Sequence, residues 1–455
     1  MQYISTRGNT PAMSFKDAVI TGLAPDGGLL LPEHIPDVRE RLDDWRSLDF
    51  VGLAKELIGL FVDDIPRTDL QRLIEKAYLT FDTPEVVRMV EVGDVHVLEL
   101  FHGPTLAFKD VALQLLGRLF DYILDKSGEH LNIVGATSGD TGSAAIAGVH
   151  GQPHIDIFVM YPNGRVSDLQ ELQMTTYEDE NVHCLAVEGS FDDCQGLLKE
   201  LFNDLEFKQR LHLGAVNSVN WARVLAQIVY YGYASLRFSS DVRFCVPTGN
   251  FGNVFAGYLA RRMGFPIEKL IVATNENDIL AQFFHTGVYQ RGEVRFTSTP
   301  AMDIQVASNF ERYLYYYLGE DAERLDTFMD RFASTGSAQL DGPPQEEAIL
   351  ATSVATQDLM GTIGEVFRNS NYVADPHTAV GLVSAARFAS RGTPVVCVAT
   401  AHPAKFPESV CEATQKDTVR HPALEALVRK PTRRTVIRPN LDGVKAFIEM
   451  HARQR

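Results

Sequence analysis

Lys109 is expected at the start of a helix, an unfavourable position for a lysine that has no chemical function. It follows the turn-forming segment Phe101-His-Gly-Pro-Thr-Leu-Ala-Phe108 and opens a stretch whose apolar residues recur at three- and four-residue spacing, as on a buried helix face. A lysine at a helix start is disfavoured, because the positive end of the helix dipole repels its charge. Two explanations are open: the side chain reaches solvent, or its amine is neutral and forms a Schiff base with a carbonyl cofactor.

The loop 135–142, Gly-Ala-Thr-Ser-Gly-Asp-Thr-Gly, is a candidate anion site. It lies between an expected strand that ends at Val134 and an expected helix that begins at Ser143. Its glycines let the backbone approach a ligand, and free amides and hydroxyls at a helix start suit a carboxylate. The alternative is an ordinary capped helix, with Asp140 or Ser138 as the N-cap.

The loop 247–253, Pro-Thr-Gly-Asn-Phe-Gly-Asn, is a second candidate anion site. It separates an expected strand ending at Val246 from an expected helix over 254–263. Consecutive amides beside two glycines form a concave nest that the helix dipole reinforces, which suits a phosphate. The loop lacks the GK[ST] of a P-loop and the GxGxxG of a dinucleotide site. The alternative is a tight turn without a ligand.

Thr400 is a third candidate, because it follows the expected strand 394–399 and would present a hydroxyl at the strand end. A threonine there is ordinarily a helix cap. Together, a reactive lysine, a phosphate nest and a strand-end hydroxyl describe a pocket for a phosphorylated aldehyde. Pyridoxal 5'-phosphate fits this description, because it binds by an imine to lysine, by its phosphate and by its ring nitrogen.

Short β-branched runs alternate with helical patterns and position these loops. Strands are expected at 132–134, 154–160, 182–187, 242–246, 270–273 and 394–399, with helices such as 194–205 and 221–236 between them. Such alternation predicts parallel sheets covered by helices on both faces. Ligands of these sheets bind beyond the C-terminal ends of the strands, where all three candidate loops fall.

The chain divides into three expected units. Residues 1–95 form an N-terminal subdomain, which contains a short strand at 3–5 and a glycine-rich turn at 22–28. Residues 96–240 form a smaller α/β domain with Lys109 and the carboxylate loop. Residues 241–455 form a larger α/β domain with the phosphate loop, a mostly helical insertion near 303–357 and two short helices in the tail.

Composition limits the class of partner. The net charge of −17 and the pI near 5.2 argue against nucleic acid or an anionic membrane. The five cysteines contain no CxxC pair and indicate reduced thiols in a cytoplasmic protein. We see no signal peptide and no apolar stretch long enough to span a membrane. A small anionic substrate remains compatible with the overall charge.

Other polar residues have ordinary explanations. His34, His96, His130 and His150 fall in no ligand-spaced cluster, so no metal site is expected. Asp375-Pro-His377 opens a helical pattern and is interpreted as a cap, with contact to the pocket as the alternative.

The chain resembles the threonine synthase family, in its longer form from enteric bacteria and fungi. The resemblance covers nearly the whole length and rests on seven segments in the family's order. They are Tyr3-Ile-Ser-Thr-Arg-Gly8, Gly22-Leu-Ala-Pro-Asp-Gly-Gly28, Phe101-His-Gly-Pro-Thr-Leu-Ala-Phe-Lys-Asp110, Ala136-Thr-Ser-Gly-Asp-Thr-Gly142, Asn217-Ser-Val-Asn-Trp-Ala-Arg223, Pro247-Thr-Gly-Asn-Phe-Gly-Asn253 and Ala401-His-Pro-Ala-Lys-Phe406.

This resemblance implies a fold-type II pyridoxal-phosphate enzyme, similar to the tryptophan synthase β chain, with two parallel-sheet α/β domains. It implies a carbon–oxygen lyase that acts on a phosphate ester, O-phospho-L-homoserine. Elimination of phosphate from Cγ and addition of water at Cβ would give L-threonine, in the last step of threonine biosynthesis. Relatives of this long form also suggest a monomer or a weak homodimer.

The resemblance assigns roles residue by residue. Lys109 would be the Schiff-base lysine and the proton shuttle, and Asp140 would lie near the cofactor's ring hydroxyl. Shorter relatives carry asparagine at that place, which leaves the charge of the Asp140 contact open. Cofactor binding would also use Thr248, Gly249, Asn250, Phe251, Gly252, Asn253 and Thr400. The substrate carboxylate would meet Thr137, Ser138 and Thr141, and the substrate phosphate would meet Asn217, Ser218, Asn220 and Arg223, with Thr105 and His102.

Two other functions stay open at this point. A phospho-lyase of the same fold would stop after elimination and release 2-oxobutyrate, ammonia and phosphate. A silent protein would bind pyridoxal phosphate and act through partners, although the intact Lys109, both anion loops and Arg223 argue against it. Arg223 could also be a solvated helix arginine, but its guanidinium can bind phosphate through two parallel hydrogen bonds.

Overall fold

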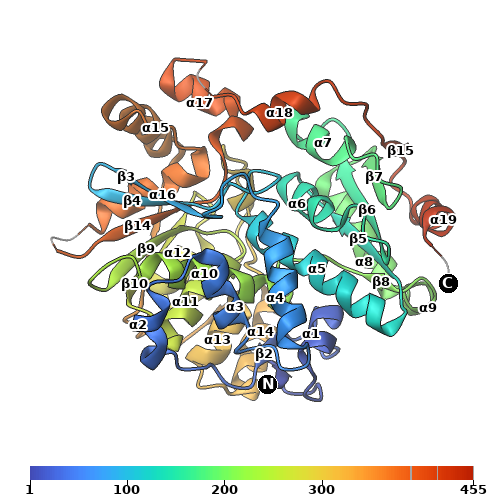
Figure 1. Cartoon of the computed structure of the whole chain (residues 1–455), viewed down its shortest axis with the longest axis horizontal. Helices are drawn as coiled ribbons and strands as arrows, with labels where there is room; N and C mark the ends of the chain where they lie inside the picture. The colour runs from blue at the N-terminus through green and yellow to red at the C-terminus, as the bar shows by residue number, and fades with distance from the viewer. Residues whose placement is uncertain (390–391, 418, 454–455) are drawn as a thin grey trace.

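Two large β-sheets lie side by side and organise the molecule (Figure 1). The structure is a computed structural model that describes residues 1–389, 392–417 and 419–453. Both sheets are covered by helices on two faces, and their central strands are almost entirely buried. Strands of this kind are mostly apolar without alternation, as 155–162 are apart from Asp156, because water reaches neither face.

The larger sheet has six strands in the order β13-β10-β9-β14-β4-β3. Neighbouring strands are parallel, except for the antiparallel pair β3 and β4. Its strands are β3 (Arg88–Val92), β4 (Val95–Glu99), β9 (Val242–Pro247), β10 (Ile267–Thr274), β13 (Ile349–Ser353) and β14 (Val395–Ala399). Helices associated with it are α10 (Trp221–Ser235), α11 (Gly252–Met263), α12 (Ile279–Thr286), α15 (Thr356–Ser370), α16 (Pro376–Arg387) and α17 (Pro407–Thr414).

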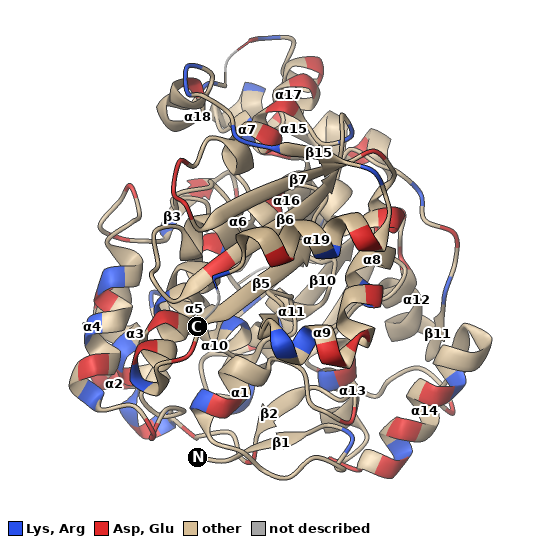
Figure 2. Ribbon diagram, turned by 90° about the vertical axis from the view of Figure 1, so that its right-hand side faces the viewer, with Lys and Arg blue, Asp and Glu red and all other residues tan. Residues whose placement is uncertain are grey.

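The smaller sheet has five parallel strands in the order β15-β7-β6-β5-β8. These strands are β5 (Leu131–Ala136), β6 (Ile155–Pro162), β7 (Val182–Val187), β8 (Leu213–Gly214) and β15 (Thr435–Ile437). Its helices are α5 (Lys109–Ser127), α6 (Asp140–Val149), α7 (Asp168–Thr175), α8 (Phe191–Asn203), α9 (Leu205–Arg210), α18 (Pro422–Leu427) and α19 (Leu441–His451). Charged residues are concentrated on the outer helices and nearly absent from these strands (Figure 2).

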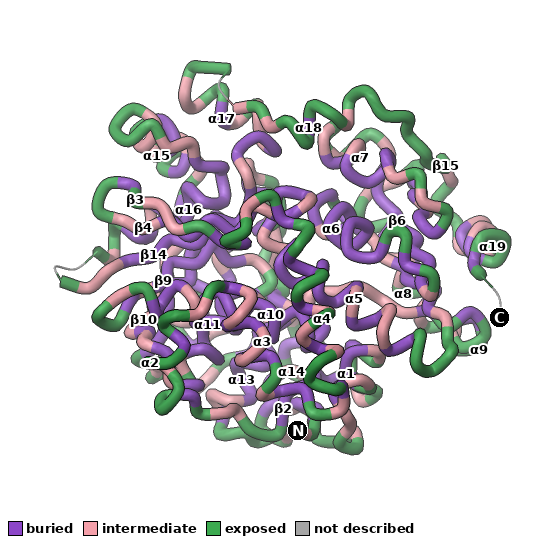
Figure 3. Tube along the Cα trace, viewed as in Figure 1, coloured by how far each residue is buried: buried purple, intermediate pink, exposed green. Residues whose placement is uncertain are grey.

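The N-terminal residues form a separate layer against α5 and α10. They contain β1 (Tyr3–Ser5), β2 (Leu30–Pro32), η1 (Arg39–Arg41), α1 (Phe15–Thr21), α2 (Leu42–Trp45), α3 (Phe50–Ile58) and α4 (Arg67–Tyr78). Helix α10 is almost completely buried between this layer, α5 and α11, and the layer covers one side of α5 (Figure 3). Both helices carry candidate site residues in their first turns, Lys109 on α5 and Arg223 on α10. The layer therefore helps to position these two residues.

The predicted fold class, parallel α/β sheets with an N-terminal unit, is confirmed. The predicted strands correspond to β5, β6, β7, β9, β10 and β14, and the predicted helices correspond to α8 and α10. Within the described residues, no helix is long and apolar enough to cross a membrane.

The sheets do not follow the expected domain limits. Strand β4 begins at the expected boundary but pairs with β14 in the larger sheet, and β15 of the tail pairs with β7 in the smaller one. A run of apolar residues predicts a strand but does not identify its neighbour, because pairing depends on contacts distant in sequence.

The segment 303–357 also differs from the expected helical insertion. It contains α13 (Phe310–Tyr317) and α14 (Ala322–Thr335), but β12 (Ser337–Gln339) pairs with β11 (Val288–Gln290), and β13 is an edge strand of the larger sheet. A five-residue apolar run does not distinguish a short strand from a helical turn. Two short 3-10 turns, η2 (Pro300–Met302) and η3 (Pro403–Lys405), complete the described elements.

Arg312 on α13 joins three segments that surround the site. Its guanidinium is fully buried and donates to the Leu30 carbonyl at 2.9 Å, to the Val219 carbonyl at 2.6 Å and to Asn309 Oδ1 at 2.6 Å. Asn309 in turn donates to the Asn250 carbonyl at 3.2 Å. Arg312 therefore links the N-terminal layer directly to the segment 217–223, and through Asn309 to the loop 247–253.

We expect Arg312→Met to lower the free energy of unfolding by about 3 kcal/mol, because it leaves buried carbonyls without a charged donor. Urea denaturation followed by tryptophan fluorescence measures the change. Arg331→Met is the matched control, because Arg331 is exposed on the next helix, and its effect should stay within about 0.5 kcal/mol. Equal losses in the two variants would contradict this account.

Candidate active site

A cavity of about 90 Å³ lies beyond the C-terminal ends of β9 and β14, where residues from around both sheets meet. This is the expected place for a ligand of parallel sheets. Predicted residues in its wall are Lys109, Thr141, Ser218, Arg223, Thr248, Gly249, Asn250, Phe251, Gly252, Asn253 and Thr400. The structure thus brings together three loops that are far apart in the sequence.

Lys109 is the first residue of α5 and points into this cavity rather than into solvent. Its side chain is 12% exposed. The preceding residues are fixed to the larger sheet, because Phe108 N–H donates to the Thr400 carbonyl at 2.8 Å and Ala107 bridges to Ala401. The first explanation for this lysine, escape to solvent, is therefore excluded.

Burial is the main cause that lowers the pKa of Lys109 below its ordinary value. The charges of Lys405 and Arg223 lower it further. Asp140 opposes them, since its Oδ2 lies 3.6 Å from the lysine Nζ. A lowered pKa increases the fraction of neutral, nucleophilic amine at neutral pH.

The loop 137–142 is held by one hydroxyl. Thr137 Oγ1 accepts from the amides of Gly139 at 3.0 Å and Gly142 at 2.9 Å, and Ser138 is exposed. Gly139 occupies the N-cap position of α6, where no side-chain cap bond is made. The alternative of a helix capped by Asp140 or Ser138 is therefore wrong, and Asp140 is free to face Lys109.

Two amides of the loop 248–253 are used within the fold, since Thr248 N–H donates to the Ala273 carbonyl at 2.8 Å and Phe251 N–H to the Gly249 carbonyl at 2.9 Å. The predicted amide nest therefore concerns the other amides of the loop. Phe251 is the N-cap of α11 with a φ of 64°, a left-handed conformation that is costly for phenylalanine and is found mainly at functional sites. No side chain caps this helix, so the first amides of α11 have no intrahelical partner. The loop packs closely, because a Cβ at Gly249 would lie 2.7 Å from the Ala301 carbonyl.

Asn253 presents a donor to this nest. Its Oδ1 accepts from the hydroxyls of Tyr230 at 2.5 Å and Tyr231 at 2.8 Å, which fixes the orientation of the amide. Its Nδ2 is buried and has no hydrogen-bond partner among the described residues. A buried orphan donor beside uncapped amides suits an anionic oxygen, so these residues fit a phosphate group.

His377 is a further cavity residue, at the start of α16. The sequence interpretation of a helix cap is confirmed for Asp375, whose carboxylate accepts from the amides of His377 at 2.9 Å and Thr378 at 3.2 Å. The alternative, contact with the pocket, also holds, because His377 lines the cavity. Its Nδ1 lies 2.9 Å from Asp375, and its buried Nε2 has no partner among the described residues.

Arg223 is buried rather than solvated, with 4% of its surface exposed. Burial lowers its pKa to about 10, so the guanidinium stays charged at neutral pH. One Nη donates to the Asn217 carbonyl at 2.7 Å, while Nε is buried without a partner in the described part of the chain. A buried charge with an unused donor at a cavity wall is suited to bind an anion.

Several residues expected at the substrate lie outside the cavity. Asn220 caps α10 and donates to the Val19 carbonyl at 2.8 Å, and Asn217 Oδ1 accepts from two amides of its own turn. Thr105 Oγ1 donates to Asp110 at 2.7 Å. His102 binds Glu99 and Asp82 instead. Polar side chains in turns bond their own backbone as readily as a ligand, and the sequence does not separate the two uses.

Thr137 and Ser138 also lie outside the wall of the main cavity. Thr137 lines a small adjoining pocket together with Thr141. Thr141 therefore connects the two spaces, whereas the hydroxyl of Thr137 is used within its own loop.

Lys405 is a charged site residue that the sequence analysis did not assign. It is 2% exposed, and its Nζ lies 2.9 Å from Asp140 Oδ1. It stands in the segment Ala401–Phe406 that carried the family resemblance, and a lysine after a buried strand was the available signal. Gln227, on α10, was also missed, and it donates to the Arg223 carbonyl at 2.8 Å.

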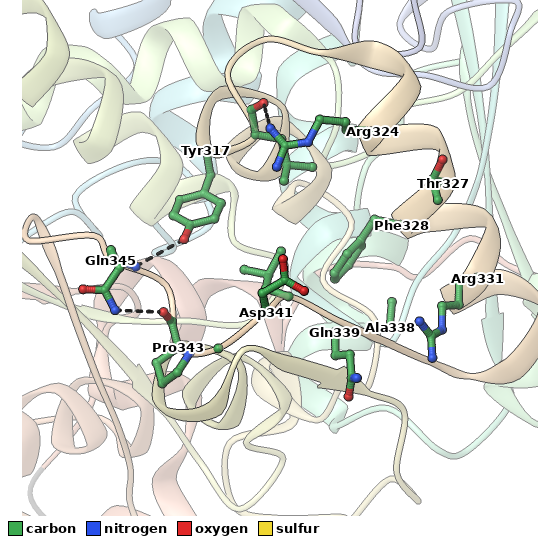
Figure 4. Close-up of a pocket in the computed structure, with 13 residues that line it drawn as sticks. Tyr317, Arg324, Thr327, Phe328, Arg331, Ala338, Gln339, Asp341, Pro343 and Gln345 are labelled. Carbon is green, nitrogen blue, oxygen red and sulfur yellow. Dashed lines mark hydrogen bonds between the residues drawn. The ribbon is translucent and has the colours of Figure 1, made fainter.

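A larger cavity of about 610 Å³ lies away from these residues, between α13, α14 and the segment 338–345 (Figure 4). Phe328 forms part of its buried floor, while Arg324, Arg331 and Asp341 are exposed at its sides. None of the predicted site residues is among those that line it. Cavity size alone therefore does not locate the chemistry of this protein.

Comparison with known proteins defines the class. A family model described as "Pyridoxal-phosphate dependent enzyme" matches residues 84–401. Models described as "Threonine synthase N terminus" and "Threonine synthase, C-terminal" match residues 2–78 and 378–448. With its two parallel sheets and buried lysine, the chain is a fold-type II pyridoxal-phosphate enzyme.

Individual relatives narrow this assignment. The threonine synthase of Pseudomonas aeruginosa is 45% identical, with 99% of this chain and 98% of the relative covered. The crystal structure of PLP-bound threonine synthase from Brucella melitensis is 44% identical and covers both chains fully, with a TM-score of 0.97. The yeast threonine synthase structure is 40% identical, with a TM-score of 0.95 and coverage of 99% and 98%. The chain belongs to the threonine synthase family.

We expect Gly249→Ala to weaken binding of pyridoxal phosphate at least tenfold, because the added Cβ would collide with the Ala301 carbonyl and displace the amide nest. Titration of the cofactor-free protein, followed by absorbance, measures the dissociation constant. Gly361→Ala on α15 is the control, because a Cβ there meets nothing within 4 Å. Unchanged affinity in Gly249→Ala would remove this loop from the cofactor site.

Proposed function

We propose that this chain converts O-phospho-L-homoserine and water into L-threonine and phosphate, with pyridoxal phosphate as the cofactor. One observation carries the proposal: a largely buried lysine amine lines the same cavity as the uncapped start of α11 and a buried arginine that has an unused donor. The pair of anion sites suits two phosphates, one on the cofactor and one on the substrate. Family membership supports the same reaction.

The cofactor would be held at three places. Lys109 would hold its aldehyde carbon, the amides and side chains of Thr248 to Asn253 its phosphate, and Thr400 its ring nitrogen. Asp140 would lie near its ring hydroxyl. When bound, the cofactor supplies an electron sink that stabilises negative charge next to the amino group of the substrate.

Lys109 would move the protons of the reaction. When it is not bonded to the cofactor, the Lys109 side chain would be a largely buried amine whose surroundings favour the neutral form. A neutral amine is a general base, and it can take a proton from substrate Cα and return one at Cγ. A flexible four-carbon side chain lets one group serve several neighbouring carbons on the same face.

Arg223 would bind the substrate phosphate and retain it as it leaves Cγ. One Nη donates to the Asn217 carbonyl, so the guanidinium is oriented before substrate arrives. Ser218 lies in the same wall and its hydroxyl is 2.7 Å from that of Ser308. A fixed cation stabilises the growing negative charge without reorganisation, which favours cleavage of the Cγ–O bond.

Cysteine content supports a reducing, cytoplasmic setting. Cys184, Cys194, Cys245 and Cys397 are buried free thiols, and burial raises the pKa of each. Buried thiols of raised pKa are poor nucleophiles. They therefore belong to the packing rather than to the proposed chemistry.

Lys109→Ala should abolish turnover of O-phospho-L-homoserine and remove the absorbance of lysine-bound cofactor. Lys126→Ala is the control, because Lys126 is exposed near the end of the same helix. Product analysis on the unmodified protein tests the reaction itself. Threonine with phosphate supports the proposal, while 2-oxobutyrate without threonine refutes it in favour of a phospho-lyase.

Arg223→Met should lower kcat/KM for O-phospho-L-homoserine by about 100-fold or more, which corresponds to about 3 kcal/mol of lost phosphate binding. Cofactor affinity, measured separately, should change far less, because the nest at 248–253 is untouched. A loss of cofactor affinity equal to the loss of kcat/KM would instead assign Arg223 to the cofactor phosphate.

A further inference from the structure

A second lysine amine is buried beside the first. Lys405 lies in η3, directly after β14, and its Nζ donates to the Thr105 carbonyl at 2.7 Å and pairs with Asp140 Oδ1 at 2.9 Å. Its side chain is 1% exposed. It does not line the main cavity, and its direct contact with the site is the ion pair with Asp140.

Asp140 is shared between the two amines. Its Oδ1 accepts from Gln170 Nε2 at 3.0 Å as well as from Lys405, and its Oδ2 faces Lys109 at 3.6 Å. Burial alone would raise the pKa of Asp140, but the ammonium of Lys405 and then that of Lys109 hold it well below the ordinary value. Asp140 is therefore ionised at neutral pH.

A lone carboxylate so close to Lys109 would hinder its chemistry. A negative charge at this distance in a water-poor site favours the protonated amine, and a protonated amine is neither nucleophile nor base. Lys405 supplies one positive charge on the opposite oxygen of the same carboxylate. The Asp140–Lys405 pair then has no net charge, and its field at Lys109 is weaker than that of Asp140 alone.

Other charged groups lie near this pair. Arg223 faces Lys109 from α10 and acts in the same direction as Lys405. Asp110 and His402 face Lys405. Burial raises the pKa of Asp110 to about 6 against the stabilising effects of Thr105 and Lys405, and burial together with His421 and His102 lowers the pKa of His402 to about 4. At neutral pH, Lys405 is the cation that contacts Asp140 directly while remaining outside the cavity.

We propose that Lys405 is a positioning residue for Lys109: it cancels the charge of Asp140 and fixes that carboxylate, so that the Lys109 amine is free to lose its proton. Because Lys405 follows β14 and Asp140 begins α6, the pair also joins the larger sheet to the smaller one at the site. The inference rests on the proposed role of Lys109.

Competitive labelling of the full-length, cofactor-free protein with acetic anhydride tests this directly. Mass spectrometry of the Lys109 peptide across a pH series gives the midpoint at which the amine becomes reactive, without substrate or cofactor. We expect Lys405→Met to move this midpoint upward by about one pH unit. At a pH below the midpoint, Lys109 would then be acetylated about tenfold more slowly. Each variant is first shown to rebind pyridoxal phosphate, which verifies its fold.

Matched variants separate charge from structure. Lys405→Met combined with Asp140→Asn removes both charges and should return the midpoint to near that of the unmodified protein. Lys405→Arg keeps the charge and should leave the midpoint nearly unchanged, as should Lys416→Met at the surface. An unchanged midpoint in Lys405→Met, or no return in the double variant, overturns the inference.

The outcome for the unmodified protein is informative in its own right. A Lys109 midpoint at the ordinary lysine value would refute the proposed role of Lys109 together with this inference. A lowered midpoint that Lys405→Met does not move would refute the inference alone. On the cofactor-loaded enzyme, the acidic limb of the kcat/KM profile should shift upward in Lys405→Met, in the same direction as the labelling midpoint.

Discussion

The burial of one amine at the start of a helix is the constraint on which the rest of this structure depends. Lys109 stands where the dipole of α5, the surrounding low-dielectric packing and two neighbouring cations all disfavour a proton on its nitrogen. Such a position is costly for folding. The N-terminal layer, the two sheets and the bonds made by Arg312 leave only 12% of this side chain exposed.

Division of the site between two sheets follows from this constraint. Lys109 and Asp140 lie at helix starts next to the smaller sheet. The loop 248–253 and Thr400 follow strands of the larger sheet. Two backbone hydrogen bonds, from Phe108 N–H to the Thr400 carbonyl and from His402 N–H to the Leu106 carbonyl, join the segment before Lys109 to the segment after β14. The cavity forms where the two sheets meet. Its buried polar groups lack hydrogen-bond partners among the described residues, and a phosphorylated cofactor could supply them.

The sequence was most informative where chemistry and secondary structure coincide. Glycine-rich loops after apolar strands located the nest at 248–253 and the loop at 137–142, and Lys109 was identified by its conflict with the helix dipole. It was less informative about which polar side chains face the ligand. Asn220 and Thr105 are of types that bind phosphate, but their side chains are used by a helix cap and by Asp110. Lys405 was overlooked because its role depends on Asp140, which approaches it only in the folded chain.

Strand order in the larger sheet has a consequence for how this protein is made. Strand β14 lies between β9 and β4, although it is synthesised long after both, and β15 completes the smaller sheet later still. On the ribosome, β4 and β9 must therefore wait, with unpaired edges, for a partner that emerges near the end of translation. Contacts between segments so distant in sequence form slowly, and strand edges that lack a partner are prone to aggregate until the last strands are available.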